Sequence, residues 1–387
     1  MKKLFLLLSI IIIFSACNNN DEPEKVSRTV LVYMVADNTL TDVVEANVGS
    51  MMAGLKATSN ADNLIIYLDD FNKTPVLYKL KKSNDGSVTK EVIKNYSEQN
   101  SLDVSVMKGI LSEVYSSYPA DSYGLILWSH GYSWVPSPST KTVSTRWFGQ
   151  DNSTKTQGDT DDYMDIPDLA NALTVAPHLD FIMFDACLMS SVEVAYQLKD
   201  RADYLIATPT EVIDSGFPYK QIIEPMFSSQ KNYTEMASRF YNYYNAMSGQ
   251  YKSATIAVTK CSEMDNLATA TKKIIAAHPL EFYTIVPGGI QLYDRVGSSD
   301  HFAYDFGNLI EDIATTEEWT NFQKQLNATV VYKATTDYFI NLKIDPNHFS
   351  GLGAYIPQQS QTVYNAFFKT LSWYDAAGWD QTAWGSN

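Results

Sequence analysis

The stretch HLDFIMFDACLMSSVEVAYQL, residues 178–198, joins an apolar strand to a helix through Asp185, Ala186 and Cys187. Residues 181–184 form a short apolar run, which is typical of a strand that is buried on both faces. Beyond Cys187 the apolar residues recur at helical spacing, with Ser190 and Ser191 in the expected first turn. The pattern predicts that Cys187 lies between the carboxyl end of a strand and the amino end of a helix. Ligands bind at this edge in open α/β sheets, and a helix amino end lowers the pKa of a thiol.

Asp185 and Cys187 also have ordinary structural interpretations. A cysteine after an apolar run often packs as a small, inert apolar side chain. A carboxylate at the start of a helix can accept hydrogen bonds from its free N–H groups. A catalytic role for Cys187 therefore requires a partner base from elsewhere in the chain.

Strand and helix patterns alternate along the first part of the chain. Apolar strand patterns occupy residues 29–36, 63–70, 123–131 and 202–209, and helical patterns follow the first of these and occupy residues 101–118 and 165–174. A hairpin turn is expected at residues 84–86, and residues 132–163 read as a long loop rich in Ser, Thr, Pro and Asp. The remainder is more helical, at residues 233–247, 261–278, 304–314 and 316–331. This order predicts an α/β fold with a mostly parallel sheet flanked by helices and a more helical C-terminal part.

His130 is the histidine best placed to serve Cys187. It ends the strand pattern after the apolar residues 125–128, and the carboxyl ends of parallel strands meet at one sheet edge. Gly131 lets the backbone approach closely and offers an N–H group to a developing oxyanion. His178 belongs to the opposite end of the cysteine strand, roughly 20 Å or more away. No local pattern directs the other three to this edge: His278, His301 and His348.

The amino end has the pattern of an export signal. Lys2 and Lys3 precede an apolar run at residues 4–14, which matches a signal-peptide core and is short for a membrane span. The following FSAC resembles the bacterial lipoprotein box, with Cys17 as the lipidated residue, although Phe14 stands where Leu is commonest. Asn18 then implies sorting to the outer membrane of a Gram-negative bacterium, and the acids of the tether resemble surface-export signals. The alternative is an ordinary signal peptide that is cut nearby.

Composition excludes several classes of protein. The 387 residues carry a net charge of -15, which disfavours general nucleic-acid binding and favours basic peptide partners. Apart from Cys17 only Cys187 and Cys261 remain, so no disulfide framework is expected, and no Cys/His spacing suggests zinc. The G-x-S-x-G motif of serine hydrolases is absent, and no G-x-G-x-x-G dinucleotide motif follows the first strand.

Several segments together resemble the clostripain-like cysteine peptidases of the caspase–hemoglobinase clan. They are YGLILWSHG, DFIMFDACLMSSVEVAYQL, LVYMVADNTL and ADYLIATPTEVIDSGFPY, and the resemblance covers residues 28–225 well. It implies a caspase-like fold with Cys187 as nucleophile, His130 as acid/base, and oxyanion donors near Gly131 and Cys187. It further implies that Asp185 lines the pocket for a substrate Arg or Lys, and Asp214 is a candidate for the pocket wall.

The resemblance raises calcium as a possible cofactor, because clostripain itself uses it. Four acids of the long loop are candidates, but their spacing fits no known calcium loop, and a solvated acidic loop is favoured: Asp151, Asp159, Asp161 and Asp162. No cofactor is otherwise required, and no metal site is assigned.

Relatives in this family cut themselves in the region between the histidine and cysteine strands. The loop here offers three basic residues, Lys141, Arg146 and Lys155. Arg146 is favoured because a guanidinium pairs bidentately with a carboxylate. An intact, constitutively open loop is nearly as well supported, because its prolines stiffen it.

The sequence thus predicts a signal peptide at residues 1–16, a tether at 17–27, a catalytic domain at 28–225, and a C-terminal part at 226–387 packed on the catalytic sheet. The expected function is that of an exported lipoprotein, anchored to the membrane by lipid, that cleaves proteins or peptides after Arg or Lys with a Cys–His dyad. The alternative is a surface binding lipoprotein that keeps the peptidase fold without turnover.

Overall fold

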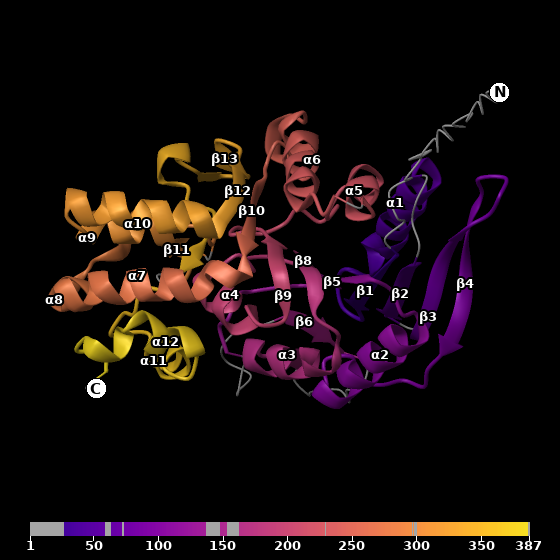
Figure 1. The fold of residues 1–387 in the computed structure, drawn as a ribbon, viewed down its shortest axis with the longest axis horizontal. Helices are drawn as coiled ribbons and strands as arrows, with labels where there is room; N and C mark the ends of the chain where they lie inside the picture. Colours follow the sequence, from indigo (N-terminus) through magenta and orange to yellow (C-terminus); the bar gives the residue numbers. More distant parts are fainter. Residues whose placement is uncertain are drawn as a thin grey trace, which may run out of the picture.

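A nine-stranded sheet runs through the computed structural model, in the order β12-β10-β9-β8-β5-β1-β2-β3-β4 (Figure 1). The structure describes residues 27–58, 63–71, 73–136, 148–152, 162–228, 230–295, 297 and 300–385. The central strands of the sheet, β2, β1, β5, β8 and β9, are mutually parallel. On either side of them, β10 pairs antiparallel with β9, and β3 pairs antiparallel with β2. The predicted α/β fold with a mostly parallel sheet is confirmed.

The bounds of the elements follow the chain order. The strands of the large sheet are β1 (Arg28–Ala36), β2 (Asn63–Asp70), β3 (Lys73–Lys82), β4 (Val88–Asn95), β5 (Ser122–Trp128), β8 (Leu179–Asp185), β9 (Ala202–Ala207), β10 (Thr255–Lys260) and β12 (Val330–Thr335). The helices are α1 (Val44–Ala57), α2 (Val104–Ser117), α3 (Ile166–Ala172), α4 (Val192–Leu198), α5 (Tyr219–Met226), α6 (Tyr233–Asn245), α7 (Met264–Ala277), α8 (Pro279–Thr284), α9 (Phe306–Ile313), α10 (Thr316–Thr329), α11 (Thr362–Phe368) and α12 (Ser372–Ala377).

Helices cover both faces of the parallel strands. Helices α1, α5 and α6 lie on one side of the sheet, and α2 and α3 lie on the other (Figure 1). All nine residues of β1 and all seven of β8 are buried, as expected for strands covered on both faces. The apolar character of these strands therefore follows from their central place in the sheet.

The C-terminal part continues the same sheet beyond β9. Strand β10 pairs with β9, and β12 pairs with β10, so strands from both sides of residue 225 form one hydrogen-bonded layer. Helix α7 packs between α10 and α12 beside this end of the sheet (Figure 1). Two short antiparallel pairs also belong to this part: β11 (Tyr304–Asp305) pairs with β15 (Gly353–Ala354), and β13 (Tyr338–Phe339) forms a hairpin with β14 (Leu342–Lys343).

The segment after His130 is more structured than a plain loop. Two short strands, β6 (Phe148–Asp151) and β7 (Asp162–Met164), form an antiparallel pair within it. Phe148 also bridges to Gly131, and the amide of Gly149 donates to the His130 carbonyl at 2.9 Å. The expectation of an unbroken loop over residues 132–163 was wrong at β6 and β7. Polar composition hid two strands that are too short to show a periodic pattern.

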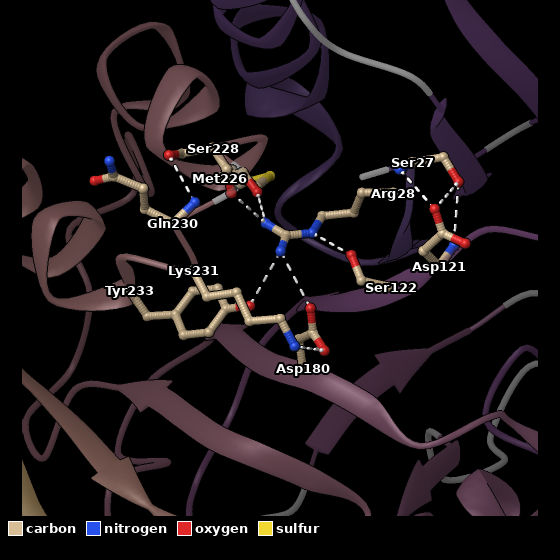
Figure 2. Close-up of polar contacts among 10 residues, drawn as sticks. All are labelled: Ser27, Arg28, Asp121, Ser122, Asp180, Met226, Ser228, Gln230, Lys231 and Tyr233. Atoms are coloured by element: carbon tan, nitrogen blue, oxygen red, sulfur yellow. Dashed lines mark hydrogen bonds and ion pairs between the residues drawn. The ribbon is translucent and has the colours of Figure 1, made fainter. Parts of the chain in front are cut away.

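Arg28 forms a buried polar junction at the amino ends of the parallel strands, away from the cysteine edge. Figure 2 shows its guanidinium between Ser122 at 2.8 Å and Asp180 at 3.1 Å, with the Met226 carbonyl as a further acceptor. Lys231 also donates to Asp180, at 2.9 Å. The junction joins β1, β5 and β8 to the segment between α5 and α6. A buried charge is tolerated here because it is both paired and hydrogen-bonded.

Candidate active site

The pairing of β5 with β8 brings the predicted histidine and cysteine to one edge of the sheet. The two strands are parallel, and Trp128 is in register with Asp185. His130 and Cys187 each follow two residues after this pair. Adjacent strands lie about 4.8 Å apart, so the register alone places both residues at neighbouring positions beyond the strand ends.

Cys187 lies in a turn after β8 and not at a helix end. The amides of Leu188 and Ser190 donate to the carbonyls of Thr210 and Thr208, at 2.8 and 3.0 Å, so the chain after Cys187 runs antiparallel to the segment after β9. Helix α4 begins only at Val192. The expected helix start directly after Cys187 was therefore wrong, because backbone pairing with a distant segment overrides the helical spacing of the apolar residues.

Two local features mark the transition from the cysteine to helix α4. Leu188 is buried and has φ 64°, a left-handed conformation that is strained for a side chain of this size. Ser191 caps the helix and accepts from the amide of Val194 at 3.3 Å. The strained residue turns the chain out of the strand direction immediately after the thiol.

The thiol of Cys187 is protonated in this arrangement. Burial raises its pKa to about 12, and the amide of Val212, which donates to Sγ at 3.2 Å, opposes this rise only in part. The carboxylates of Glu211 and Asp185 raise the pKa further, and Arg295 lowers it. The expectation of a thiol pKa lowered by a helix terminus is thus corrected: the helix starts too far along the chain, and desolvation dominates.

The His130 ring lines the same cavity as Cys187, and Thr39 holds it in place. Nε2 is 2.9 Å from the hydroxyl oxygen of Thr39, in the segment after β1. Burial lowers the pKa of His130, which favours the neutral ring. The sequence analysis did not identify Thr39, although the end of β1 belongs to the same sheet edge as His130 and Cys187.

Asp185 lies at the buried side of the cavity and is 5% exposed. It accepts a hydrogen bond from the Tyr219 hydroxyl at 2.7 Å and one from the Phe217 amide at 3.1 Å. Burial raises the pKa of Asp185 to about 6, and these two donors oppose the rise. Its partners belong to the start of α5 and the residues before it, so it does not cap α4.

A cavity of about 440 Å³ unites the candidate residues. Asp185, Cys187 and His130 line it together with Asp214, which is exposed. Seven other lining residues, which were not predicted, lie after β9 or in the C-terminal part: Glu211, Val212, Ile213, Gly216, Arg295, Phe339 and Ile340. Asp185 and Cys187 line one cavity, as the resemblance implied.

Gly131 lies directly against the backbone of Cys187. A Cβ atom at this position would be 2.7 Å from the Cys187 carbonyl oxygen and 2.8 Å from the Ala186 Cβ. The close approach that the sequence analysis expected of this glycine is therefore present. The absence of a side chain keeps the backbone after His130 next to the nucleophile.

The remaining histidines pair with carboxylates outside this cavity. His178 contacts Asp203 at the other end of β8, at 2.9 Å, and His278 contacts Glu318 at the same distance. His301 contacts Asp294 at 2.6 Å, and His348 contacts Asp345 at 3.4 Å. Within the described part of the chain, none of these four histidines lines the cavity of the candidate site.

The predicted lipidation and self-cleavage residues lie outside the described part of the chain, and the described acids of the long loop form no metal site. Cys17, Lys141, Arg146 and Lys155 lie outside the described residues, as do Asp159 and Asp161. Asp151 accepts from the Ser101 amide at 2.7 Å and lies in register with Asp162 across the β6–β7 pair. Within the described ranges, no group of three or more His, Cys, Asp or Glu residues is arranged to hold a metal ion. Over the same ranges, no helix combines the length and apolar character that a bilayer span requires.

Comparisons with known proteins agree with this geometry. The model of the clostripain family matches residues 32–384. Clostripain of Hathewaya histolytica is 30% identical over 232 residues, which cover 54% of this chain and only 43% of clostripain.

Two solved structures extend the similarity over most of the chain. A secreted C11 cysteine protease from Bacteroides thetaiotaomicron, in complex with an irreversible peptide inhibitor, has a TM-score of 0.80 and 33% identity, and covers 92% of this chain and 100% of that one. An inactive zymogen C11 protease from Parabacteroides distasonis has a TM-score of 0.79 and 34% identity, and covers 92% and 99%. With the family match spanning both parts of the sheet, the chain belongs to the clostripain family of cysteine peptidases.

Proposed function

We propose that this protein is an endopeptidase that cleaves after Arg or Lys, with Cys187 as nucleophile and His130 as acid and base. The observation that carries the proposal is the shared cavity, in which a buried carboxylate, a thiol and an imidazole lie together. The C11 protease from B. thetaiotaomicron, which was solved with an irreversible peptide inhibitor, supports a peptide substrate for this site.

In the proposed reaction, the Cys187 thiol gives its proton to the neutral His130 ring and Sγ attacks the peptide carbonyl carbon. His130 then transfers that proton to the leaving amine as the C–N bond breaks, which leaves an acyl-enzyme. Water hydrolyses the thioester with His130 again as base. Because the resting thiol and ring are both neutral, the ion pair forms only when substrate is bound.

Asp185 supplies the specificity in this proposal. An ionised carboxylate in a largely buried pocket is stabilised by a substrate guanidinium or ammonium group. The exposed Asp214 adds negative charge at the same cavity. Backbone N–H groups near Gly131 and Cys187 are the candidate donors to the oxyanion.

The decisive test is covalent labelling by an arginyl or lysyl chloromethylketone. We expect labelling of the wild type at Cys187, no labelling of Cys187→Ala, and unchanged labelling of Cys261→Ser. Cys261 is buried and provides the matched control for an unrelated thiol. A wild-type protein that folds but is neither labelled nor able to cleave basic peptides would instead be the non-catalytic binding lipoprotein.

We further propose that Cys17 carries a lipid that anchors the protein to the outer membrane, with the peptidase facing the cell surface. The support is the sequence pattern at the amino end, together with the secreted relative. Cys17→Ala is expected to move the protein from the detergent-soluble membrane fraction to the soluble fraction. A mutant that stays firmly membrane-bound would contradict the assignment of Cys17.

Thiol chemistry of this kind needs no metal ion, so we propose that no cofactor takes part in the reaction. Peptide hydrolysis in the presence of EDTA is expected to equal that without it. A loss of activity that calcium restores would identify a calcium requirement and contradict this proposal.

A further inference from the structure

Arg295 places one positive charge in the wall of an otherwise acidic cavity. Of the described residues that line the cavity, it is the only Arg or Lys, opposite the carboxylates of Asp185, Glu211 and Asp214. The reaction proposed above does not use it. A cation held at the cleft of a peptidase that selects basic residues needs a separate explanation.

The C-terminal part of the chain holds this guanidinium in place. Its Nε donates to the side-chain oxygen of Asn341 at 3.0 Å, and its carbon lies 6.0 Å from the centroid of the Phe339 ring. Both partners belong to the β13–β14 hairpin. Between them, Ile340 has φ 54° and is 39% exposed, and its amide donates to Ser253 at 2.7 Å. The hairpin tip therefore presents a fixed cation beside an exposed apolar side chain.

The two Nη groups of the Arg295 guanidinium form no hydrogen bond to the described residues. Within the described residues, Arg295 forms no salt bridge, and its single side-chain hydrogen bond uses Nε. Burial raises the pKa of the nearby Glu211, and a hydrogen bond from the Arg295 backbone and the charge of its guanidinium oppose this rise. The Nη groups can thus accept a planar carboxylate partner in a bidentate arrangement.

Arg295 does not imitate a substrate arginine in the specificity pocket. The groups that set the pKa of Asp185 are its own burial, the Phe217 amide and the Tyr219 hydroxyl, and Arg295 is not among them. Its charge acts instead on Cys187 and Glu211. The two groups are also held by different elements, since Arg295 contacts the β13–β14 hairpin, whereas Asp185 is bonded to Phe217 and Tyr219.

We propose that Arg295 forms a second substrate subsite, which binds the carboxylate side chain of a Glu or Asp at one fixed position near the scissile bond. The inference rests on the proposed function and deepens it: the preferred substrate carries a basic residue before the cut and an acidic residue close by. Ile340 provides apolar surface for the stem of the acidic side chain.

The test compares matched peptides that contain Arg at the cleavage position and either Glu or Gln at each neighbouring position in turn. We expect kcat/KM to favour Glu over Gln by about twofold to fivefold at one position, since partly exposed ion pairs are weak. Arg295→Gln should abolish this preference, and Arg295→Glu should reverse it in favour of the Gln peptide. Lys343→Gln is the matched control, because it removes a positive charge from the same hairpin outside the cavity.

Several results would overturn the inference. One is equal cleavage of the Glu and Gln peptides at every position by the wild type, a measurement that does not depend on the folding of any variant. Another is a preference for Glu that survives in Arg295→Glu. If Arg295 only tunes the pKa of Cys187, the Arg295 variants should shift the pH profile of thiol alkylation and leave the ratio of kcat/KM between the Glu and Gln peptides unchanged. That result would also refute the subsite. Failure to cleave any basic peptide would overturn the proposed function itself, and is distinct from cleavage without a charge preference.

Discussion

Replacing Asp185 by Asn should weaken peptidase activity while making the protein more stable. The side chain is almost fully buried, and the amide keeps an oxygen that can accept from Tyr219 and Phe217. What is lost is the negative charge that a substrate Arg or Lys would pair with. A charge-assisted hydrogen bond contributes about 1.5–3 kcal/mol, so kcat/KM for basic peptides should fall roughly tenfold to hundredfold.

The effect on stability follows from the raised pKa of Asp185. Its pKa rises from 3.8 in the unfolded chain to about 6 in the folded protein, so the folded state holds the proton more tightly. Stability from this group is therefore greatest below the unfolded pKa and is lost as the pH rises through about 6. At pH 7 the cost is up to about 3 kcal/mol, which Asp185→Asn should recover and which should vanish near pH 3–4.

The assays are kcat/KM for peptides with Arg, Lys or Gln before the cut, and urea unfolding at several pH values. Wild-type kcat/KM for the basic peptides should fall below about pH 6, where Asp185 becomes protonated. Tyr219→Phe is the control, since it removes a hydrogen bond and leaves the charge. It should keep the selectivity for Arg over Gln. Unchanged selectivity in Asp185→Asn, with Cys187 still alkylated, would refute the reasoning.

Three other predictions concern catalysis, processing and folding. Cys187→Ala should abolish peptide hydrolysis, and His130→Ala should reduce it almost as far. Peptide assays of both purified variants test this, and full activity in either variant would exclude that residue from the reaction. If the enzyme cleaves its own loop at Arg146, gels should show two fragments for wild type and one band for Cys187→Ala, whereas one band in both, with an active wild type, would exclude self-cleavage as a requirement. Arg28→Met should lower the free energy of unfolding, measured in urea, by about 3 kcal/mol, because it leaves the buried Asp180 carboxylate with one cationic partner fewer. A change below about 0.5 kcal/mol would show that the junction contributes little to stability.

The sequence by itself determined the local elements and the chemistry that they carry. Apolar runs with the lengths of buried strands predicted β1, β5 and β8, because strands covered on both faces have little choice but apolar side chains. The same reasoning brought His130 and Cys187 to one edge, since parallel strands end together. The resemblance to the clostripain-like peptidases implied that Asp185 lines the pocket beside Cys187, and both residues line one cavity.

Only the tertiary structure decided what surrounds those residues. Backbone hydrogen bonds to Thr208 and Thr210 hold the segment after Cys187 outside helix α4, and this nonlocal pairing outweighs the helical spacing of its apolar residues. The same packing buries the thiol and raises its pKa, where a helix terminus would have lowered it. Arg295 and the β13–β14 hairpin reach the cavity from more than a hundred residues along the chain. Such contacts depend on how the ends of the sheet close around the site, and no periodicity within a single segment encodes them.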